Sequence, residues 1–406
     1  MKEWKTYRLG DLIKISSGFP YKGEHIGHGD NYILGMGCVS FKETFLHSGI
    51  RSYSDDAPER YVAKPGEIVL ATRQQSDNLP ILGMPAIIPD IYKGRKMIIG
   101  ANLYKVQNES AFTNEYIYWL MKSPAYIHHI KSCQTGTTVR MITKANIEDF
   151  IFKAPEESER KRISDFLWNL ENKIQVNRQI NDNLEQQAGA LYKSWFIDFE
   201  PFKDGEFVES EFGLIPKTWR VGTLSDLAEI TMGQSPSGKS YNEIGDGILF
   251  YQGRAEFGER YPSIRLYTTE PSRIAEQNSV LLSVRAPVGD TNIAFNKCCI
   301  GRGLASIKAK HGFNSFIFYM IKSLKDQFDL YNGEGTVFGS INRDSLNSMK
   351  VIVPTNDVIN DFEKIVAPLD LNYKSLFTEN LLLTQQRDTL LPKLMSGELK
   401  INEIDC

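Results

Sequence analysis

Hydrophobic residues recur with a heptad spacing in two long stretches of the chain. In the first, the stripe positions step by four and three residues from Ile163 to Trp195. The second stretch runs from Phe362 to Leu394 and repeats this pattern 199 residues later. Such spacing indicates long helices that bury one stripe against a partner. We therefore expect one long helix over residues 156–197 and another over residues 355–396.

The two long helices are expected to pair with each other, because each carries its own stripe and follows its own globular segment. A pseudo-two-fold arrangement would make them an antiparallel coiled coil. Asparagines in a seam cost stability but fix register, whereas asparagines at its rim are merely tolerated, and the sequence leaves both readings open. The expected seam contacts are Leu170, Ile174, Asn181, Leu184, Leu369, Tyr373, Asn380 and Leu383.

The segments that precede the long helices have a mixed pattern. Short β-branched and aromatic runs, such as NYILGMG (31–37) and SVLLSV (279–284), lie between Gly and Pro turns and favour strands. Residues 114–123 and 314–323 have helical length and spacing. We expect an α+β fold with two similar mixed bodies, at residues 1–155 and 219–354.

Two further segments complete the expected organisation. Residues 198–218 are acidic and contain Gly and Pro, which predicts a linker whose phenylalanines dock on a neighbouring surface. Residues 397–406 are expected to form a C-terminal tail.

The two bodies are copies of one repeated unit, and such repeats indicate duplicated structure. WKTYRLGDLIKISSG from Trp4 aligns with WRVGTLSDLAEITMG from Trp219. EIVLATR (67–73) resembles SVLLSVR (279–285), which places Arg73 opposite Arg285. The alignment offset changes along the unit, so the parts that differ in length lie inside each repeat.

The segment GQSPSGKS (233–240) matches the phosphate-binding pattern G-x-x-x-x-G-K-[ST]. That pattern needs a helix from its lysine onward, and the glycines at 245 and 247 oppose one. Pro236 has no N–H to offer a phosphate. In the duplication Gly233 aligns with Gly18, whose loop has no Gly-Lys-Ser. We expect a turn here, with a P-loop NTPase as the alternative.

Charge and composition narrow the class of protein. The chain has 406 residues and a formal net charge of −3, but residues 1–155 hold 19 Lys and Arg against 15 Asp and Glu. Residues 219–354 hold 15 against 13, so both bodies are mildly basic. Five cysteines without a C-x-x-C pattern predict no metal site. With no long apolar run and no signal core, we expect a cytoplasmic protein.

At this point the sequence resembles the specificity subunits of type I restriction–modification systems. The resemblance rests on the W-x(4)-L-x-D-L openings at Trp4 and Trp219 and on the FKAPEESERKRI entry to the first long helix. The LYKSWFIDFEPF exit and the terminal LLPKLMSGEL add to it. The order of the four segments is also that of the family, and the resemblance covers nearly the whole chain.

The resemblance implies a non-catalytic subunit that recognises double-stranded DNA. Each body would be a target-recognition domain for one part of a bipartite, asymmetric target. The helices would act as spacers and dock two methyltransferase (modification) subunits, and motor-nuclease restriction subunits would join them. The sequence contains no [DN]-P-P-[FYW] tetrapeptide, so S-adenosylmethionine is expected in the partner and no cofactor in this chain. A helical scaffold without sequence-specific DNA readout is the alternative.

Several polar side chains have the chemistry of DNA readout. Arg makes two parallel hydrogen bonds to guanine, and Gln or Asn does so to adenine. Lys and Arg in turns suit phosphate contacts, which position the protein without specifying sequence. Surface arginines also pair with carboxylates, so the sequence leaves open which of them contact bases. The candidates are Arg73, Gln74, Gln75, Asn78, Lys93, Arg95, Lys96, Arg140, Gln252, Arg254, Arg285, Arg302 and Arg343. No residue is expected to be catalytic.

Overall fold

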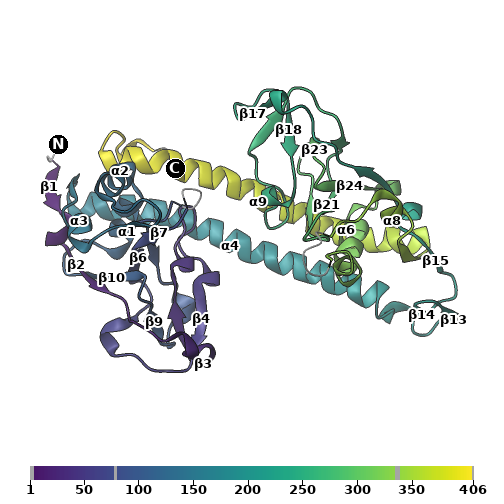
Figure 1. The fold of residues 1–406 in the computed structure, drawn as a ribbon, viewed down its shortest axis with the longest axis horizontal. Coiled ribbons are helices and arrows are strands. Elements are labelled where there is room, and N and C mark those ends of the chain that lie inside the picture. The colour runs from purple at the N-terminus through teal and green to yellow at the C-terminus, as the bar shows by residue number, and fades with distance from the viewer. Residues whose placement is uncertain (1–3, 77–79, 334–338, 405–406) are drawn as a thin grey trace. The chain divides into compact units, whose positions relative to one another are not determined.

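The chain forms two compact units, seen in a computed structural model that describes residues 4–76, 80–333 and 339–404 (Figure 1). Unit 1 comprises residues 1–176 and 379–406, and unit 2 comprises residues 177–378. The division crosses the two long helices, α4 (Glu157–Phe196) and α9 (Asn356–Ser396). Each unit therefore contains one mixed body together with part of each long helix.

The body of unit 1 contains two main sheets. The first is antiparallel and has the strand order β2 (Ile13–Ser17), β10 (Leu103–Asn108), β6 (Ile68–Ala71), β8 (Pro85–Ile87). The second has the order β4 (Ile50–Tyr53), β3 (Ile26–Leu34), β9 (Met97–Ile99), β5 (Val62–Ala63), with β3 and β9 parallel. Shorter pairs join β1 (Lys5–Arg8) to β12 (Ile151–Ala154) and β7 (Arg73–Gln74) to β11 (Arg140–Met141).

Strand β6 shows why an uninterrupted apolar run forms a strand here. Its side chains alternate between the two faces of the sheet, as in any strand. Ile68 and Leu70 join the hydrophobic cluster that includes the helices, whereas Val69 and Ala71 join the cluster on the other face. Both faces of β6 are covered, so its sequence has no polar alternation.

The helices of unit 1 begin at residues suited to capping. The Thr113 side chain accepts a hydrogen bond from Tyr116 N at 3.2 Å at the start of α1 (Asn114–Lys122). Ser123 caps α2 (Pro124–Cys133), whose first residue is a proline. Ser and Thr caps satisfy free N–H groups, and proline has none to satisfy there. The short helix α3 (Lys144–Glu148) is likewise capped by Thr143.

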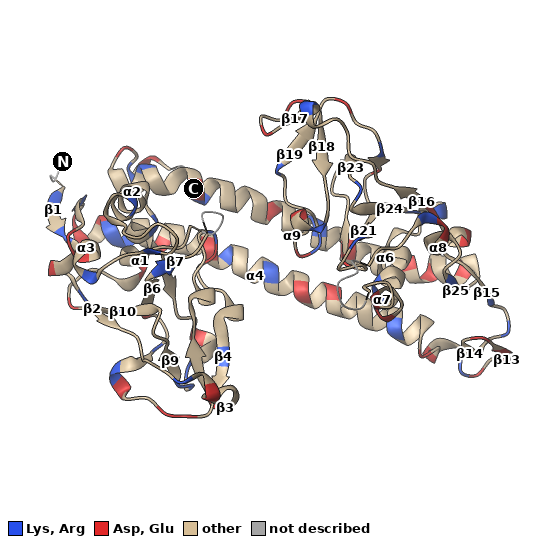
Figure 2. Ribbon diagram, viewed as in Figure 1, with Lys and Arg blue, Asp and Glu red and all other residues tan. Residues whose placement is uncertain are grey.

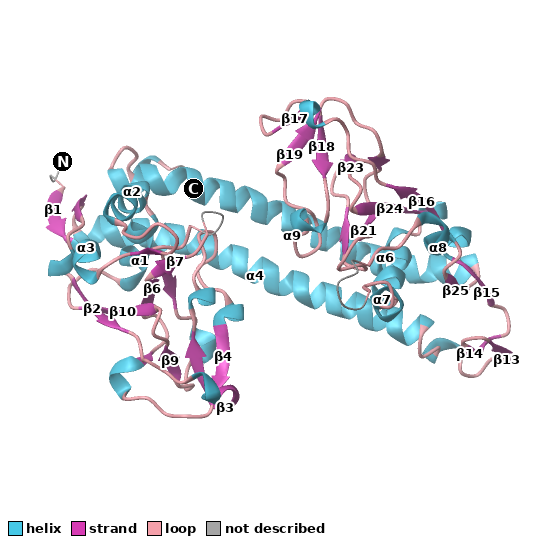
Figure 3. Ribbon diagram, in the orientation of Figure 1, coloured by secondary structure: helices cyan, strands magenta, loops and turns pink. Residues whose placement is uncertain are grey.

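Unit 2 repeats this plan, as the distribution of strands and helices in Figure 3 shows. Its antiparallel sheet has the order β16 (Ala228–Met232), β24 (Leu304–Ala309), β21 (Val280–Ser283), β22 (Thr291–Ile293). Its second sheet has the order β17 (Tyr241–Asn242), β19 (Leu266–Thr268), β18 (Ile248–Tyr251), β23 (Cys298–Ile300), β20 (Ile274–Ala275), with β18 and β23 parallel. The remaining elements of its body are β15 (Arg220–Thr223) paired with β25 (Lys350–Val353), α5 (Leu224–Leu227), α6 (Asn314–Ser323), α7 (Lys325–Asp329) and α8 (Arg343–Asn347).

A close contact between two glycines recurs in both units. Gly18 N donates to Leu103 O at 2.9 Å, and Gly233 N donates to Leu304 O at 2.9 Å. A Cβ on Gly18 would lie 2.1 Å from the carbonyl oxygen of Gly100, and one on Gly233 would lie 2.2 Å from that of Gly301. Only glycine allows the two chain segments to approach this closely. The duplication expected from sequence is thus confirmed at the level of single hydrogen bonds.

The long helices pair in an antiparallel sense within each unit. In unit 1, Arg387 of α9 bonds to Glu171 of α4, and Asn380 Nδ2 donates to Ile174 O at 3.3 Å. In unit 2, the ring of Phe362 on α9 contacts the rings of Tyr192 and Phe196 on α4. Among the expected seam residues, Ile174, Asn181 and Tyr373 are buried, and Leu170, Leu184, Leu369, Asn380 and Leu383 are half-buried.

The segments after the two long helices both pack against a body. After α4, Phe199 and Phe202 contact the Trp219 ring with centroids 5.5 and 5.0 Å apart. A hairpin, β13 (Phe207–Ser210) and β14 (Gly213–Pro216), follows in the segment that we expected to be a linker. After α9, Leu399, Ile401 and Ile404 pack against the core of unit 1.

The phosphate-loop pattern has no phosphate-loop structure. Strand β16 ends at Met232, and the Gly-Lys-Ser of the pattern forms a three-residue 3-10 turn at Gly238–Ser240, followed by β17. The Ser240 hydroxyl donates to Ser237 O at 2.7 Å rather than facing a ligand site. The segment is a turn, as the duplication predicted. No helix in the part of the chain described here has the length and apolar character of a membrane span.

Candidate nucleic-acid interface

Three predicted residues of unit 2 gather around the loop Gly301–Gly303. Gly301 N donates to Tyr251 O at 2.8 Å and Gly303 N donates to Gln252 O at 3.3 Å, which brings Arg302 beside Gln252. Val284 N donates to Gly303 O at 3.0 Å, which brings in Arg285. The side chains of Gln252, Arg285 and Arg302 are exposed. An exposed glutamine with two arginines can form paired hydrogen bonds to adenine and guanine edges.

Arg254 lies next to this group but already has an ionic partner. Its Nε is 2.8 Å from Asp290 Oδ2, and about half of its side chain is exposed. Ser283 N donates to Asp290 O at 2.8 Å, so the carboxylate stands beside strand β21. An arginine held by a carboxylate keeps free N–H groups for DNA in a fixed direction, because the guanidinium has five donors.

Arg343 also belongs to this side of unit 2. Ile341 N donates to Val284 O at 3.1 Å, and Arg285 forms an isolated bridge with Ser340. Arg343 is exposed and is the first residue of α8, whose N-cap is Asn342. The structure therefore brings together all five residues predicted in the second body, which we name the unit 2 reading cluster: Gln252, Arg254, Arg285, Arg302 and Arg343.

The corresponding place in unit 1 is a two-stranded ribbon. Arg140 of β11 pairs with Gln74 of β7, and Met141 pairs with Arg73. Because side chains alternate along a strand, Gln74 and Arg140 share one face of the ribbon, whereas Arg73 lies on the other. Arg73 is exposed and Arg140 half-buried. Gln74, Arg140 and Gln134 line a cavity of about 360 Å³.

Gln74 is the predicted residue that fits DNA contact least well. Only 7% of it is exposed, and its Oε1 accepts a hydrogen bond from Leu82 N at 3.3 Å. It holds the chain that follows β7, so we leave it out of the proposed DNA-contacting set. Gln75, the next residue, is exposed. Asn78 lies outside the residues that the structure describes.

The three cations expected to bind phosphate follow the short turn Asp90–Tyr92 in unit 1. Lys93 is exposed. Arg95 Nη1 donates to the Tyr32 hydroxyl at 2.5 Å, and its guanidinium lies over that ring. Lys96 pairs with Asp56 and thereby keeps the pKa of that carboxyl below its ordinary value. Acidic and basic residues are interspersed over both units (Figure 2).

The candidate DNA-contacting sites of the two units lie at equivalent positions of the duplicated backbone. Gly100 N donates to Leu34 O at 2.9 Å, as Gly301 N does to Tyr251 O. Thr72 N donates to Asn102 O at 3.2 Å, as Val284 N does to Gly303 O. The frame is shared, but unit 1 has Gly35 and Ala101 where unit 2 has Gln252 and Arg302. The two units therefore present different donors and acceptors at equivalent sites.

Sequence reasoning missed a buried charged group in unit 2. Arg260 is only 1% exposed and lies between α4, α6 and α9. Its Nη2 donates to Asp370 Oδ1 at 2.5 Å, and its Nη1 lies 4.0 Å from Glu185 Oε2. Burial alone would lower the pKa of Arg260, but the Asp370 carboxylate raises it above its ordinary value. The one sequence signal was that Asp370 adjoins a seam position.

Unit 1 contains a buried charged group at the equivalent seam position. Glu171 of α4 pairs with Arg387 of α9 at 2.5 Å, and both side chains are nearly inaccessible. Nearby, Lys122 Nζ donates to the carbonyl oxygens of Ser40 at 2.5 Å and Phe41 at 3.0 Å. Burial, and then the Arg387 charge, lower the pKa of Lys122 to about 7.

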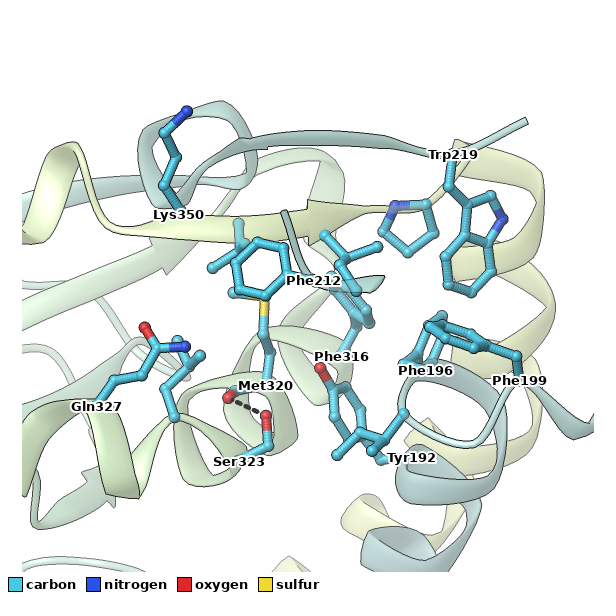
Figure 4. Close-up of a pocket in the computed structure, with 15 residues that line it drawn as sticks. Tyr192, Phe196, Phe199, Phe212, Trp219, Phe316, Met320, Ser323, Gln327 and Lys350 are labelled. Atoms are coloured by element: carbon cyan, nitrogen blue, oxygen red, sulfur yellow. Dashed lines mark hydrogen bonds between the residues drawn. The ribbon is translucent and has the colours of Figure 1, made fainter. Parts of the chain in front are cut away.

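An aromatic pocket lies where α4 ends in unit 2 (Figure 4). Its volume is about 300 Å³, and Tyr192, Phe196 and Trp219 contribute rings to its wall. Lys350 and Gln327 stand apart from these rings in the figure. A pocket with so few cations does not suit a phosphate backbone, so we do not assign it to the DNA interface. In the described part of the chain, no cluster of His, Cys, Asp and Glu has the arrangement of a metal site.

Comparison with known proteins gives a consistent result over nearly the whole chain. A family described as "Type I restriction modification DNA specificity domain" matches residues 1–186 and again residues 216–369. A Methanocaldococcus jannaschii relative, named as the specificity subunit of the type I restriction enzyme MjaX, is 31% identical over 98% of this chain and 94% of its own. The HindI specificity subunit of Haemophilus influenzae is 24% identical over 98% of this chain and all of its own.

A solved structure shares the fold. The S subunit of a type I restriction–modification system from M. genitalium has a TM-score of 0.59 with 14% identity. The match covers 97% of this chain and 96% of the other. At this identity the likeness concerns the fold alone.

Proposed function

The chain belongs to the family of type I restriction–modification DNA specificity domains, and we propose that it is the non-catalytic DNA sequence-recognition subunit of such a complex. The observation that carries this proposal is the twofold family match on a duplicated structure. Two copies of one frame, with different polar side chains at equivalent places, suit a target made of two different parts.

Each body would read one part of a bipartite, asymmetric DNA target. In unit 2 the reading cluster supplies exposed Gln252, Arg285 and Arg302 for base edges. In unit 1, Arg73, Gln75 and Arg140 would take this role, and Lys93 would contact phosphate. Lys96 and Arg95 already have partners and would position the turn that carries Lys93.

The two long helices would set the spacing between the two parts of the target and dock two methyltransferase subunits. Catalysis would belong to those partners, which would use S-adenosylmethionine, and motor-nuclease restriction subunits would add cleavage. This division of labour rests on family membership and on the helices, each of which continues without interruption from one unit into the other.

The test is methylation mapping by long-read sequencing in cells that express the chain with its methyltransferase. We expect methylation at one interrupted motif whose two parts differ. Arg302→Ala should relax specificity only in one part, because loss of a paired base contact costs about 1–3 kcal/mol of discrimination. Arg73→Ala should relax only the other part.

Lys217→Ala is the control, because this exposed lysine pairs with Glu206 at the base of the hairpin and lies outside the reading cluster. It should leave the motif unchanged. Methylation without a bipartite motif, or none at all with a folded complex, would favour a scaffold without sequence readout.

A further inference from the structure

The loop that carries part of the unit 2 reading cluster is anchored to the long helices through Arg260. This loop, residues 252–265, joins β18 to β19. Gln252 and Arg254 lie near its start, and Arg260 lies further along. Arg260 reaches Asp370 on α9, and its guanidinium lies 4.6 Å from the centres of both the Phe318 and Tyr373 rings.

The anchor contacts both long helices and the body at once. Tyr319 of α6 donates its hydroxyl to Asp370 Oδ1 at 3.0 Å, on the same carboxylate as Arg260. Glu185 of α4 faces Arg260 and also pairs with Lys322 of α6. The neighbouring Tyr261 packs on Phe377 of α9 with ring centroids 4.8 Å apart. A planar guanidinium between two rings and a carboxylate has a single favourable orientation.

The loop between the anchor and the reading residues is internally braced. Glu256 is 3% exposed and accepts a hydrogen bond from Gly253 N at 3.2 Å. Its other oxygen accepts one from Arg265 Nη2 at 2.6 Å, and Ser263 N donates to its backbone oxygen at 2.7 Å. These contacts of one buried carboxylate tie the two ends of the loop together and so connect Arg260 to the segment that carries Gln252 and Arg254.

The equivalent loop of unit 1 is also fastened by a buried cation, but in a different way. Residues 35–49 join β3 to β4. Strand β3 corresponds to β18, because β3 pairs in parallel with β9 as β18 does with β23, and β4 then corresponds to β19. Lys122 of α1 donates to the carbonyl oxygens of this loop, next to the Glu171–Arg387 pair. Lys322 aligns with Lys122 and Asp370 with Glu171, whereas Arg260 comes from the loop itself.

Resting on the proposed function, we propose that Arg260 is a positioning residue that fixes the second recognition body on the helix pair and thereby fixes the spacer length of the DNA target. The helices set the distance available between the two bodies. The contact of Arg260 with Asp370 fixes the position of the reading cluster along the helices. A body free to shift on the helices would accept targets whose two parts are separated by one base pair more or fewer.

The experiment maps methylation by the full complex with the double variant Arg260→Met/Asp370→Leu. Replacing a buried ion pair by apolar residues of similar volume commonly preserves stability, so the fold should survive. We expect both parts of the motif to keep their sequence. Methylation at sites with a spacer one base pair longer or shorter should rise roughly tenfold relative to wild type, since the coupling between two closely paired charges across an interface can reach that factor.

Two controls separate positioning from stability. Leu281→Ala removes a fully buried side chain from the core of the same body without touching the helices, and should lower the melting temperature but leave the spacer unchanged. Arg260→Lys keeps the charge without the planar contact and should relax the spacer partly.

Each outcome decides the proposal. An unchanged spacer preference in the double variant overturns it while the proposed function stands. Loss of all methylation in the double variant, with Leu281→Ala still active, also counts against it. If the wild-type complex has no interrupted motif, both the proposed function and this inference fail.

Discussion

Each unit contains a buried cationic side chain that holds a loop in place, and the two side chains differ in the groups that bind them. Arg260 is held by carboxylates, so it stays charged in the folded chain. Lys122 has mainly backbone carbonyl oxygens for partners, and burial disfavours its charge. An arginine keeps its proton in such surroundings, whereas a lysine releases it readily.

Lys122 should make the stability of unit 1 depend on pH. Its pKa is about 7 in the folded chain and near the ordinary lysine value when unfolded, so the unfolded chain binds more protons between these values. The free energy of unfolding should therefore rise with pH above about 7, by up to ~1.4 kcal/mol per unit. Denaturant unfolding of wild type and Lys122→Met at a series of pH values measures this. Parallel curves for the two proteins would contradict it.

Substitution of Lys239 tests whether the Gly-Lys-Ser segment is a turn or a nucleotide site. The Gly-Lys-Ser segment forms a 3-10 turn before β17, with no helix to direct N–H groups at a phosphate. We expect Lys239→Ala to leave the methylated motif and the melting temperature unchanged. Bound radiolabelled ATP that disappears with this substitution would restore the nucleotide-site reading.

At the scale of elements, the long helices combine an apolar stripe with charged pairs at chosen positions. Ile163, Leu167 and Leu394 are buried in unit 1, and the Glu171–Arg387 pair lies in the same interface. Removing two charges from water is expensive, and their attraction repays this only with good geometry. Such a pair adds little net stability, but it opposes any helix register that would separate the charges.

Breaking the pair should cost more than replacing it. Glu171→Ala leaves Arg387 buried without its main partner and should lower the free energy of unfolding by about 3 kcal/mol. The double variant Glu171→Leu/Arg387→Leu should recover most of that loss. Denaturant midpoints of the three proteins give the comparison. A single variant as stable as wild type would show that Asp388, the other carboxylate at Arg387, is sufficient.

At the scale of the whole molecule, the charge is nearly balanced. The net charge of −3 and the small basic excess of each body predict few phosphate contacts. Affinity for duplex DNA falls with salt by a slope of about 0.9 for each phosphate neutralised. We therefore expect DNA binding to depend more on the proposed reading residues than on general attraction to DNA.

Salt titration of DNA binding by the full complex separates the two kinds of contact. Lys93→Ala should weaken binding to every sequence and reduce the salt slope by about 1. Arg302→Ala should weaken binding to the cognate target and leave the slope for non-cognate DNA unchanged. The reverse pattern would exchange the roles assigned to these two residues.

The sequence predicted the elements well and the side-chain partners poorly, for a physical reason. Heptad spacing and internal repetition are local or periodic signals, so the long helices and the Gly233 turn could be recognised. Arg260 contacts Asp370, which is 110 residues away in the chain, and no pattern in the sequence around either residue indicates this contact. Gln74 is buried and bonded to Leu82 N, whereas Arg73 beside it on β7 is exposed, and no local pattern distinguishes the two positions. The five residues proposed for DNA contact in unit 2 were chosen by their chemistry alone, and their role stays a prediction; their proximity could be seen only in the fold.

The paired glycines also define where this chain can be recombined. Gly18 with Gly100, and Gly233 with Gly301, each close a segment whose ends meet through main-chain atoms. A cassette cut at these points joins its host through main-chain contacts at its ends, while Arg260 inside the second cassette still has to meet Asp370 outside it. Hybrid chains that take residues 234–300 from a relative should therefore keep the fold when position 260 keeps its arginine. They should acquire the DNA contacts of the exchanged segment while keeping those of the host's Arg302 and Arg343.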